Sequence, residues 1–142
     1  MKLLILVIIY MFTVKVYGLK RVAIIDSGLD VNLITPEAKK YLCKSGHYDF
    51  SRNKKGIGDD NSGHGTLIFK TLVYNMFDKK GFCVVVIKSH DSSSYFGKQL
   101  KYVAGLRIPY TNYSMYHRIN NRQHQLTLLN YLKRGGKFYN AA

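Results

Sequence analysis

Two short apolar runs, Arg21–Asp26 (RVAIID) and Cys83–Lys88 (CVVVIK), constrain the fold more than any other feature. Both are rich in β-branched residues without alternating polar ones, which is typical of strands covered on both faces. The segments around them show helical spacing, and strands that alternate with helices form parallel sheets between helical layers. At 142 residues, 46% of them hydrophobic, the chain can bury one core. We therefore expect a single α/β domain whose parallel sheet has helices on both faces.

The expected helices are indicated by caps, stops and spacing. Thr35 followed by Pro36 and Glu37 is a helix start, and Gly135-Gly136 is a helix stop. Helices are predicted from Thr35 and over 66–75, 93–106 and 122–134, and further strands over 111–115 and from 137. Apolar residues with near-helical spacing are expected to share one side of their helix; they are Leu67, Ile68, Leu72 and Met76 in one helix, and Leu126, Leu129 and Leu132 in another.

The first 18 residues have the pattern of a secretory signal. Lys2 precedes an uncharged run of 12 residues from Leu3 to Val14, and small or branched residues follow at Val16 and Gly18. A run of that length is short for a membrane span, which needs about 20 residues. We expect a signal peptide over 1–18, a secreted or periplasmic protein, and no stable membrane insertion after cleavage. A short membrane anchor or a hydrophobic first strand are the alternatives.

The two cysteines, Cys43 and Cys83, fit an exported protein with at most one disulfide. Two buried thiols fit the same spacing, so the sequence leaves both possibilities open.

The chain is strongly basic. Its 22 Lys and Arg against 8 Asp and Glu give a net charge of +14, and loss of Lys2 and Lys15 with the signal leaves +12. The basic residues are scattered in pairs, and no zinc finger, RNA-binding sheet motif or basic zipper is present. We therefore interpret the charge as a solvated basic face and expect no nucleic-acid partner.

Asp26 and His64 are the candidates for chemistry. Asp26 ends a predicted strand, where sites of parallel sheets gather, and His64 lies between Gly63 and Gly65 where a polar loop precedes a helix. A carboxylate that accepts a hydrogen bond from one imidazole nitrogen holds the tautomer and stabilises the imidazolium. The other nitrogen can then act as a general base towards a hydroxyl.

The residues around this pair resemble a known family. "VAIIDSGLD" (Val22–Asp30) resembles the aspartate motif of the subtilisin-like serine peptidases, or subtilases, and "DDNSGHGT" (Asp59–Thr66) resembles their histidine motif, in the order that the family has. "TNYSM" resembles the substrate-lining strand that follows, and "GGKFYNAA" resembles the strand that leads to the oxyanion asparagine. The resemblance runs from about Arg21 to Ala142.

The resemblance implies a serine endopeptidase that hydrolyses polypeptides with an Asp-His-Ser triad. In it Asp26 is the acid that orients the histidine, and His64 is the general base. Ser114, Met115 and Tyr116 match the stretch that binds substrate. Nothing in the chain matches the nucleophilic serine or the oxyanion asparagine. Since triad members act as a unit, the 142-residue chain alone is expected to be inactive.

The resemblance also implies the organisation of the chain. Residues 19–142 are expected to be the N-terminal portion of a subtilase catalytic domain, with a subtilisin-like fold incomplete at its C-terminus. Calcium sites are common in the family, but no acidic cluster here has convincing ligand spacing, so we expect no metal or other cofactor.

Two features depart from the family pattern. Bulky residues, Leu67–Lys70, follow the His-Gly-Thr where subtilases have small ones. Only Leu19 and Lys20 separate the predicted signal from the first strand, where secreted subtilases usually have a propeptide. The alternative function is a secreted, non-catalytic subtilase-like protein (a pseudo-peptidase) or a basic interaction protein.

Overall fold

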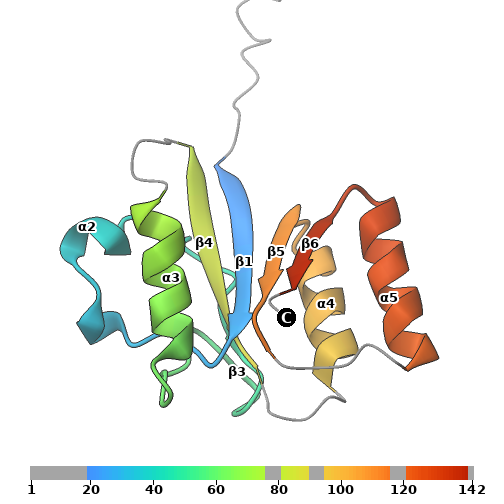
Figure 1. The fold of residues 1–142 in the computed structure, drawn as a ribbon, viewed down its shortest axis with the longest axis horizontal. Helices are drawn as coiled ribbons and strands as arrows, with labels where there is room; N and C mark the ends of the chain where they lie inside the picture. The colour runs from blue at the N-terminus through green and yellow to red at the C-terminus, as the bar shows by residue number, and fades with distance from the viewer. Residues whose placement is uncertain (1–18, 76–80, 90–94, 116–120, 141–142) are drawn as a thin grey trace, which may run out of the picture.

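The computed structural model describes residues 19–75, 81–89, 95–115 and 121–140. At the centre of the protein lies a six-stranded, mostly parallel sheet (Figure 1). The strand order is β3-β2-β4-β1-β5-β6. The expected signal peptide and Tyr116 lie outside the described residues. The expected α/β class and parallel sheet are confirmed.

The two apolar runs form the centre of the sheet. β1 (Lys20–Asp26) pairs in parallel with β4 (Phe82–Lys88), from Lys20 opposite Phe82 to Asp26 opposite Lys88. β5 (Tyr110–Tyr113) pairs with the other side of β1, and β6 (Lys137–Asn140) pairs with β5. On the far side of β4 a short hairpin of β2 (Tyr48–Asp49) and β3 (Lys54–Lys55) completes the sheet.

Helices cover both faces of the sheet, as expected. On one face lie α3 (His64–Tyr74), the single-turn α2 (Pro36–Lys39) and a 3₁₀ turn, η1 (Val31–Leu33); on the other lie α4 (Phe96–Gly105) and α5 (Arg122–Lys133) (Figure 1). The buried residues form two clusters. Ile24 of β1 belongs to the cluster of α3, and its neighbours Ala23 and Ile25 belong to the cluster of α4. Alternate side chains of β1 therefore enter opposite layers.

The shared side of the three leucines in α5 is not its buried face. Each of Leu126, Leu129 and Leu132 of α5 is 42–44% exposed. The inner face of α5 is instead formed by His124, Thr127 and Tyr131. Tyr131 is buried, and its hydroxyl donates to the Ile108 carbonyl oxygen at 2.9 Å. The hydroxyl therefore has a hydrogen-bond partner inside the core.

The apolar residues of α3 differ in their burial. Leu67 is 59% exposed, whereas Phe69 and Val73 are buried against the sheet. Met76 lies outside the described residues. Helix α3 also begins at His64, two residues before the predicted start, because the glycine-rich loop ends there and not at Thr66. No helix within the described ranges has the length and apolar character needed to cross a bilayer.

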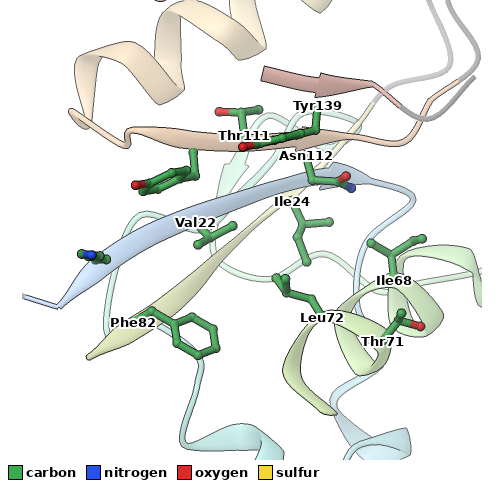
Figure 2. Close-up of a pocket in the computed structure, with 11 residues that line it drawn as sticks. Val22, Ile24, Ile68, Thr71, Leu72, Phe82, Thr111, Asn112 and Tyr139 are labelled. Atoms are coloured by element: carbon green, nitrogen blue, oxygen red, sulfur yellow. The ribbon is translucent and has the colours of Figure 1, made fainter. Parts of the chain in front are cut away.

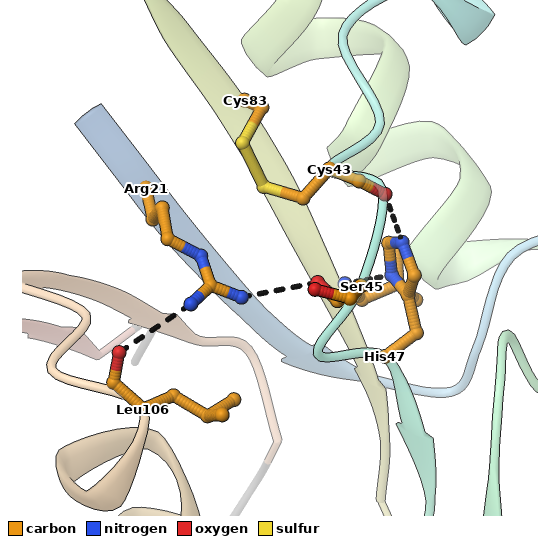
Figure 3. Close-up of a disulfide and its surroundings, with 7 residues drawn as sticks. Arg21, Cys43, Ser45, His47, Cys83 and Leu106 are labelled. Carbon is orange, nitrogen blue, oxygen red and sulfur yellow. Dashed lines mark hydrogen bonds between the residues drawn. A yellow bond between two sulfur atoms is a disulfide. The ribbon is translucent and has the colours of Figure 1, made fainter. Parts of the chain in front are cut away.

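Cys43 and Cys83 form a disulfide, which decides between the two possibilities that the sequence left open. The bond ties the loop before β2 to β4 (Figure 3). Nearby, the guanidinium of Arg21 donates to the carbonyl oxygens of Ser45, at 3.0 Å, and Leu106, at 3.4 Å. The disulfide and Arg21 therefore hold the same loop against the centre of the sheet.

His47 is part of the same support. Its Nδ1 accepts a hydrogen bond from the Val86 amide at 3.0 Å, so its Nε2 carries the proton and donates to the Cys43 carbonyl at 2.7 Å (Figure 3). Burial lowers the pKa of His47 below 6.5; the bond to Cys43 opposes this shift, and the charge of Arg21 adds to it. The folded protein therefore favours neutral His47.

Removing the disulfide is expected to destabilise the fold. The bond closes a loop with a sequence separation of 40, and the chain-entropy model gives a loss of about 4 kcal/mol for a loop of that length. The variant Cys43→Ala/Cys83→Ala should show this loss in its free energy of unfolding by urea. Reduced wild-type protein is the control and should match it; an unchanged urea midpoint after reduction would contradict the prediction.

Stability should fall as the pH drops below about 6.5 because of His47. Its pKa is lower in the folded state than in the unfolded state, so the unfolded chain takes up the proton first. The contribution of neutral His47 to the free energy of unfolding is complete above pH 6.5. It is lost on acidification, at up to about 1.4 kcal/mol per pH unit. Urea unfolding at pH 7.5, 6.5 and 5.5 should show a smaller decline for His47→Gln than for wild type; equal declines would be inconsistent with this assignment.

Candidate active site

Asp26 and His64 meet at the carboxyl edge of the sheet. Asp26 is the last residue of β1 and is completely buried, while His64 is the first residue of α3 and its side chain is 50% exposed. The imidazole Nδ1 lies 2.8 Å from Oδ1 and 3.0 Å from Oδ2 of Asp26. Two residues 38 positions apart thus form the contact that the sequence led us to expect.

This contact assigns the proton on the imidazole ring. The Asp26 carboxylate already accepts from the Ser27 amide at 2.7 Å, and as a carboxylate it can only accept from His64. Nδ1 therefore carries the hydrogen, and Nε2 presents its lone pair. The ring therefore contacts the buried Asp26 carboxylate through Nδ1. Because half of the His64 side chain is exposed, the imidazole remains an accessible base.

Asp60 anchors the start of α3. Gly63 at the N-cap has no side chain to accept from the free amides of the first turn, and the Asp60 carboxylate takes that place. It accepts from the amides of Gly63, at 2.9 Å, and Thr66, at 2.8 Å, and from the hydroxyls of Thr66, at 2.6 Å, and Ser27, at 2.8 Å. Burial acts to raise the pKa of Asp60, but these hydrogen bonds outweigh it and lower the pKa to about 2.

Sequence reasoning gave Asp60 no role, although it lies inside the quoted histidine motif. The sequence did contain an indication. Gly63 at the start of the helix has no side chain to cap it, and an acidic residue shortly before it can accept from the free amides instead.

The glycines beside His64 and Asp26 permit close approach of two backbones. A Cβ on Gly65 would collide with the Gly28 carbonyl oxygen and lie 3.2 Å from Oδ1 of Asp26. One on Gly28, whose φ is +118°, would meet the carbonyl oxygens of Gly58 and Asp59 at 2.6 and 2.5 Å. Gly63 has open space around it but adopts a φ of +78°, which L side chains rarely adopt.

The bulky residues after the histidine motif are accommodated without breaking the pair. Phe69 is buried in the cluster under α3, and Leu67 points outward. Helix α3 packs on Phe69, Thr66 and Val73, and His64 still reaches Asp26.

The expected substrate-binding residues lie at the same edge. Ser114 and Met115 follow β5, the neighbour of β1, and Tyr116 lies outside the described residues. The Ser114 amide donates to the Ile25 carbonyl at 3.1 Å, and its hydroxyl accepts from Asn112 Nδ2 at 2.5 Å. Met115 packs against the α4-side core. The Ser114 amide is therefore engaged within the sheet.

No partner for His64 Nε2 is found in the part of the chain that the structure describes. The hydroxyl of Ser27 is held by Asp60, by Asp26 and by the Gly65 amide, so it is not a nucleophile bonded to the base. Nor do the described residues contain a group of three or more His, Cys, Asp or Glu side chains that could hold a metal ion.

An apolar groove of about 580 Å³ opens on the α3 face of the sheet (Figure 2). Its lining includes Val22 and Ile24 of β1, Ile68 and Leu72 of α3, and Tyr139 of β6. Tyr139 is 56% exposed. Helices α4 and α5 pack on the opposite face of the sheet (Figure 1), so they do not cover this groove.

No family model matches this chain, and no curated protein matches it.

Gly65→Ala should disturb both stability and the site. The added methyl group collides with the Gly28 carbonyl, which is backbone and cannot swing aside, so the start of α3 must move. We expect a loss of about 1–3 kcal/mol in the free energy of unfolding. Gly105→Ala is the matched control, since it lies in a helix with nothing within 4 Å of the new Cβ. Equal urea midpoints for the two variants would contradict the packing argument.

Proposed function

We propose that Asp26 and His64 are the orienting acid and the general base of a subtilisin-like serine endopeptidase that acts on polypeptides. The nucleophilic serine and the oxyanion asparagine of this enzyme lie outside the 142 residues. The observation that carries the proposal is the contact of 2.8 Å between His64 Nδ1 and the buried Asp26 carboxylate, within the two motifs that resemble the family.

The geometry supports specific roles for the two residues. His64 Nε2 would take the proton of the attacking serine hydroxyl and later deliver it to the leaving amine. Asp26 would hold the Nδ1–H tautomer and stabilise the imidazolium, and its burial keeps water from weakening that interaction. Neither residue can cleave a peptide bond without the nucleophile.

The apolar groove supports the expectation that further polypeptide completes the domain. Its floor is formed by β1, and one wall is α3, the helix that begins with His64 (Figure 2). A segment that covers this surface would pack beside α3.

The disulfide supports the proposed location. Disulfides persist in oxidising compartments, and Cys43–Cys83 is consistent with a secreted or periplasmic protein whose first 18 residues direct its export.

One observation favours the alternative, a secreted non-catalytic relative. Among the described residues no hydroxyl or thiol is hydrogen bonded to His64 Nε2, as would be expected of a non-catalytic relative. The two proposals differ in what the coding sequence contains beyond Ala142.

The first experiment is to sequence the coding DNA past the codon for Ala142. The proposal expects the frame to continue into a Gly-Asn and later a Gly-Thr-Ser. The extended protein should react with a fluorophosphonate probe, whereas the purified 142-residue chain should not. In the extended protein Asp26→Asn should lower kcat by about 10⁴-fold, because the orienting carboxylate is lost. A stop codon directly after Ala142 would refute the peptidase and favour the non-catalytic alternative.

A further inference from the structure

The proposed acid and base leave a second carboxylate unexplained. Asp60 is one of the residues near the pair that neither motif argument used, yet each of its oxygens is engaged. Oδ1 accepts from Ser27 Oγ, Gly63 N and the Ser62 amide, and Oδ2 accepts from Thr66 N and Oγ1. Its donors come from the end of β1 and from the start of α3.

Ser27 is the junction between this carboxylate and the pair. Its hydroxyl lies 2.8 Å from Asp60 Oδ1 and 3.1 Å from Asp26 Oδ1, and it accepts from the Gly65 amide at 2.9 Å. A hydroxyl has one hydrogen, and the shorter distance directs it to Asp60. Asp26 Oδ1, the atom that His64 Nδ1 approaches at 2.8 Å, then keeps the Ser27 amide, at 2.7 Å, as its other close donor.

The place of the imidazole ring depends on where α3 begins. His64 is its first residue, and the Gly65 amide that follows is bonded to Ser27. If the contacts of Asp60 to Gly63 and Thr66 were lost, the first turn would lose the acceptor of its free amides. The ring would then be free to move relative to the buried end of β1.

We propose that Asp60 is a positioning residue: through Ser27 and Thr66 it ties the end of β1 to the first turn of α3 and so holds His64 in the Nδ1–H tautomer against Asp26. That Asp60 matters for catalysis rests on the proposed function. That Asp60 positions the His64 ring does not depend on it.

Asp60→Asn is the sharpest variant. An asparagine has the same shape but only one acceptor oxygen, and donors face both oxygens of Asp60. In one orientation the new amide nitrogen would face the Thr66 amide, which is also a donor. In the other it would face the Gly63 amide and the Ser27 hydroxyl, which are donors as well. One side of the tie must therefore break.

The measurement is a long-range ¹H–¹⁵N spectrum of the histidine rings in the 142-residue chain at pH 8. Wild type should show His64 as the Nδ1–H tautomer alone. His47 is an internal reference of the opposite kind, since its Nδ1 accepts from the Val86 amide. In Asp60→Asn we expect both tautomers of His64, exchange of its Nδ1 proton with water at least tenfold faster, and an unchanged His47.

Two control variants separate positioning from general stability. Asp59→Asn alters a neighbouring carboxylate that is 72% exposed and pairs with Arg52. Thr35→Ala removes the cap of α2, where Thr35 Oγ1 accepts from the Ala38 amide at 3.2 Å, and so destabilises the fold away from the site. Both should keep the single His64 tautomer. The same tautomer mixture in Thr35→Ala would overturn the proposal, because it would show that any destabilisation has this effect.

Ser27→Ala tests the route of the tie. It should produce the same mixture as Asp60→Asn, and the double variant should add little, because both changes break one connection. A single Nδ1–H tautomer with the wild-type exchange rate in Asp60→Asn would overturn the proposal. A stop codon after Ala142 would defeat the proposed peptidase but leave this result unaffected.

Discussion

The parallel pairing of β1 with β4 is the interaction on which the rest of the structure depends. Both strands are apolar without alternation, and their seven paired positions leave each layer of helices a continuous surface to cover. The pairing also determines the site, because β1 ends in a completely buried carboxylate. A buried charge is costly unless it is hydrogen bonded. Asp26 therefore requires donors at the one place where β1 leaves the sheet, and the Ser27 amide and His64 supply them.

The close approach of α3 to β1 provides those donors. It needs glycine at position 65, since a Cβ on Gly65 would strike the Gly28 carbonyl oxygen, and a Cβ on Gly28 would strike the carbonyl oxygens of Gly58 and Asp59 in the loop before α3. A loop that approaches so closely has free amides at the helix start, and Asp60 accepts from them. The two acids thus have different functions. Asp26 faces the imidazole, and Asp60 holds the backbone that carries it.

Strands with continuous apolar runs were predictable because burial on both faces needs nothing but apolar side chains. β1 and β4 follow those runs to within one residue, and Thr35 caps α2 as its sequence indicates. Three features were not predictable. The β2–β3 hairpin has strands of two residues, too short for any periodicity. The outward side of α5 carries three leucines, and its inner face depends on Tyr131, whose hydroxyl finds partners only in the folded chain. The disulfide was one of two possibilities that the spacing of Cys43 and Cys83 allowed.

By itself the sequence determined the α/β class, the two central strands and the pair of residue types suited to acid and base chemistry, because these follow from local composition and from short motifs. Only the tertiary structure decided that Asp26 is fully buried, that His64 keeps one nitrogen accessible, and that Ser27 turns its hydroxyl towards Asp60. Those properties arise from contacts between residues more than thirty positions apart, such as Ser27 and Asp60 or Asp26 and His64. Hydrogen-bond competition and burial depend on what the fold brings together, and no stretch of chain contains that information alone.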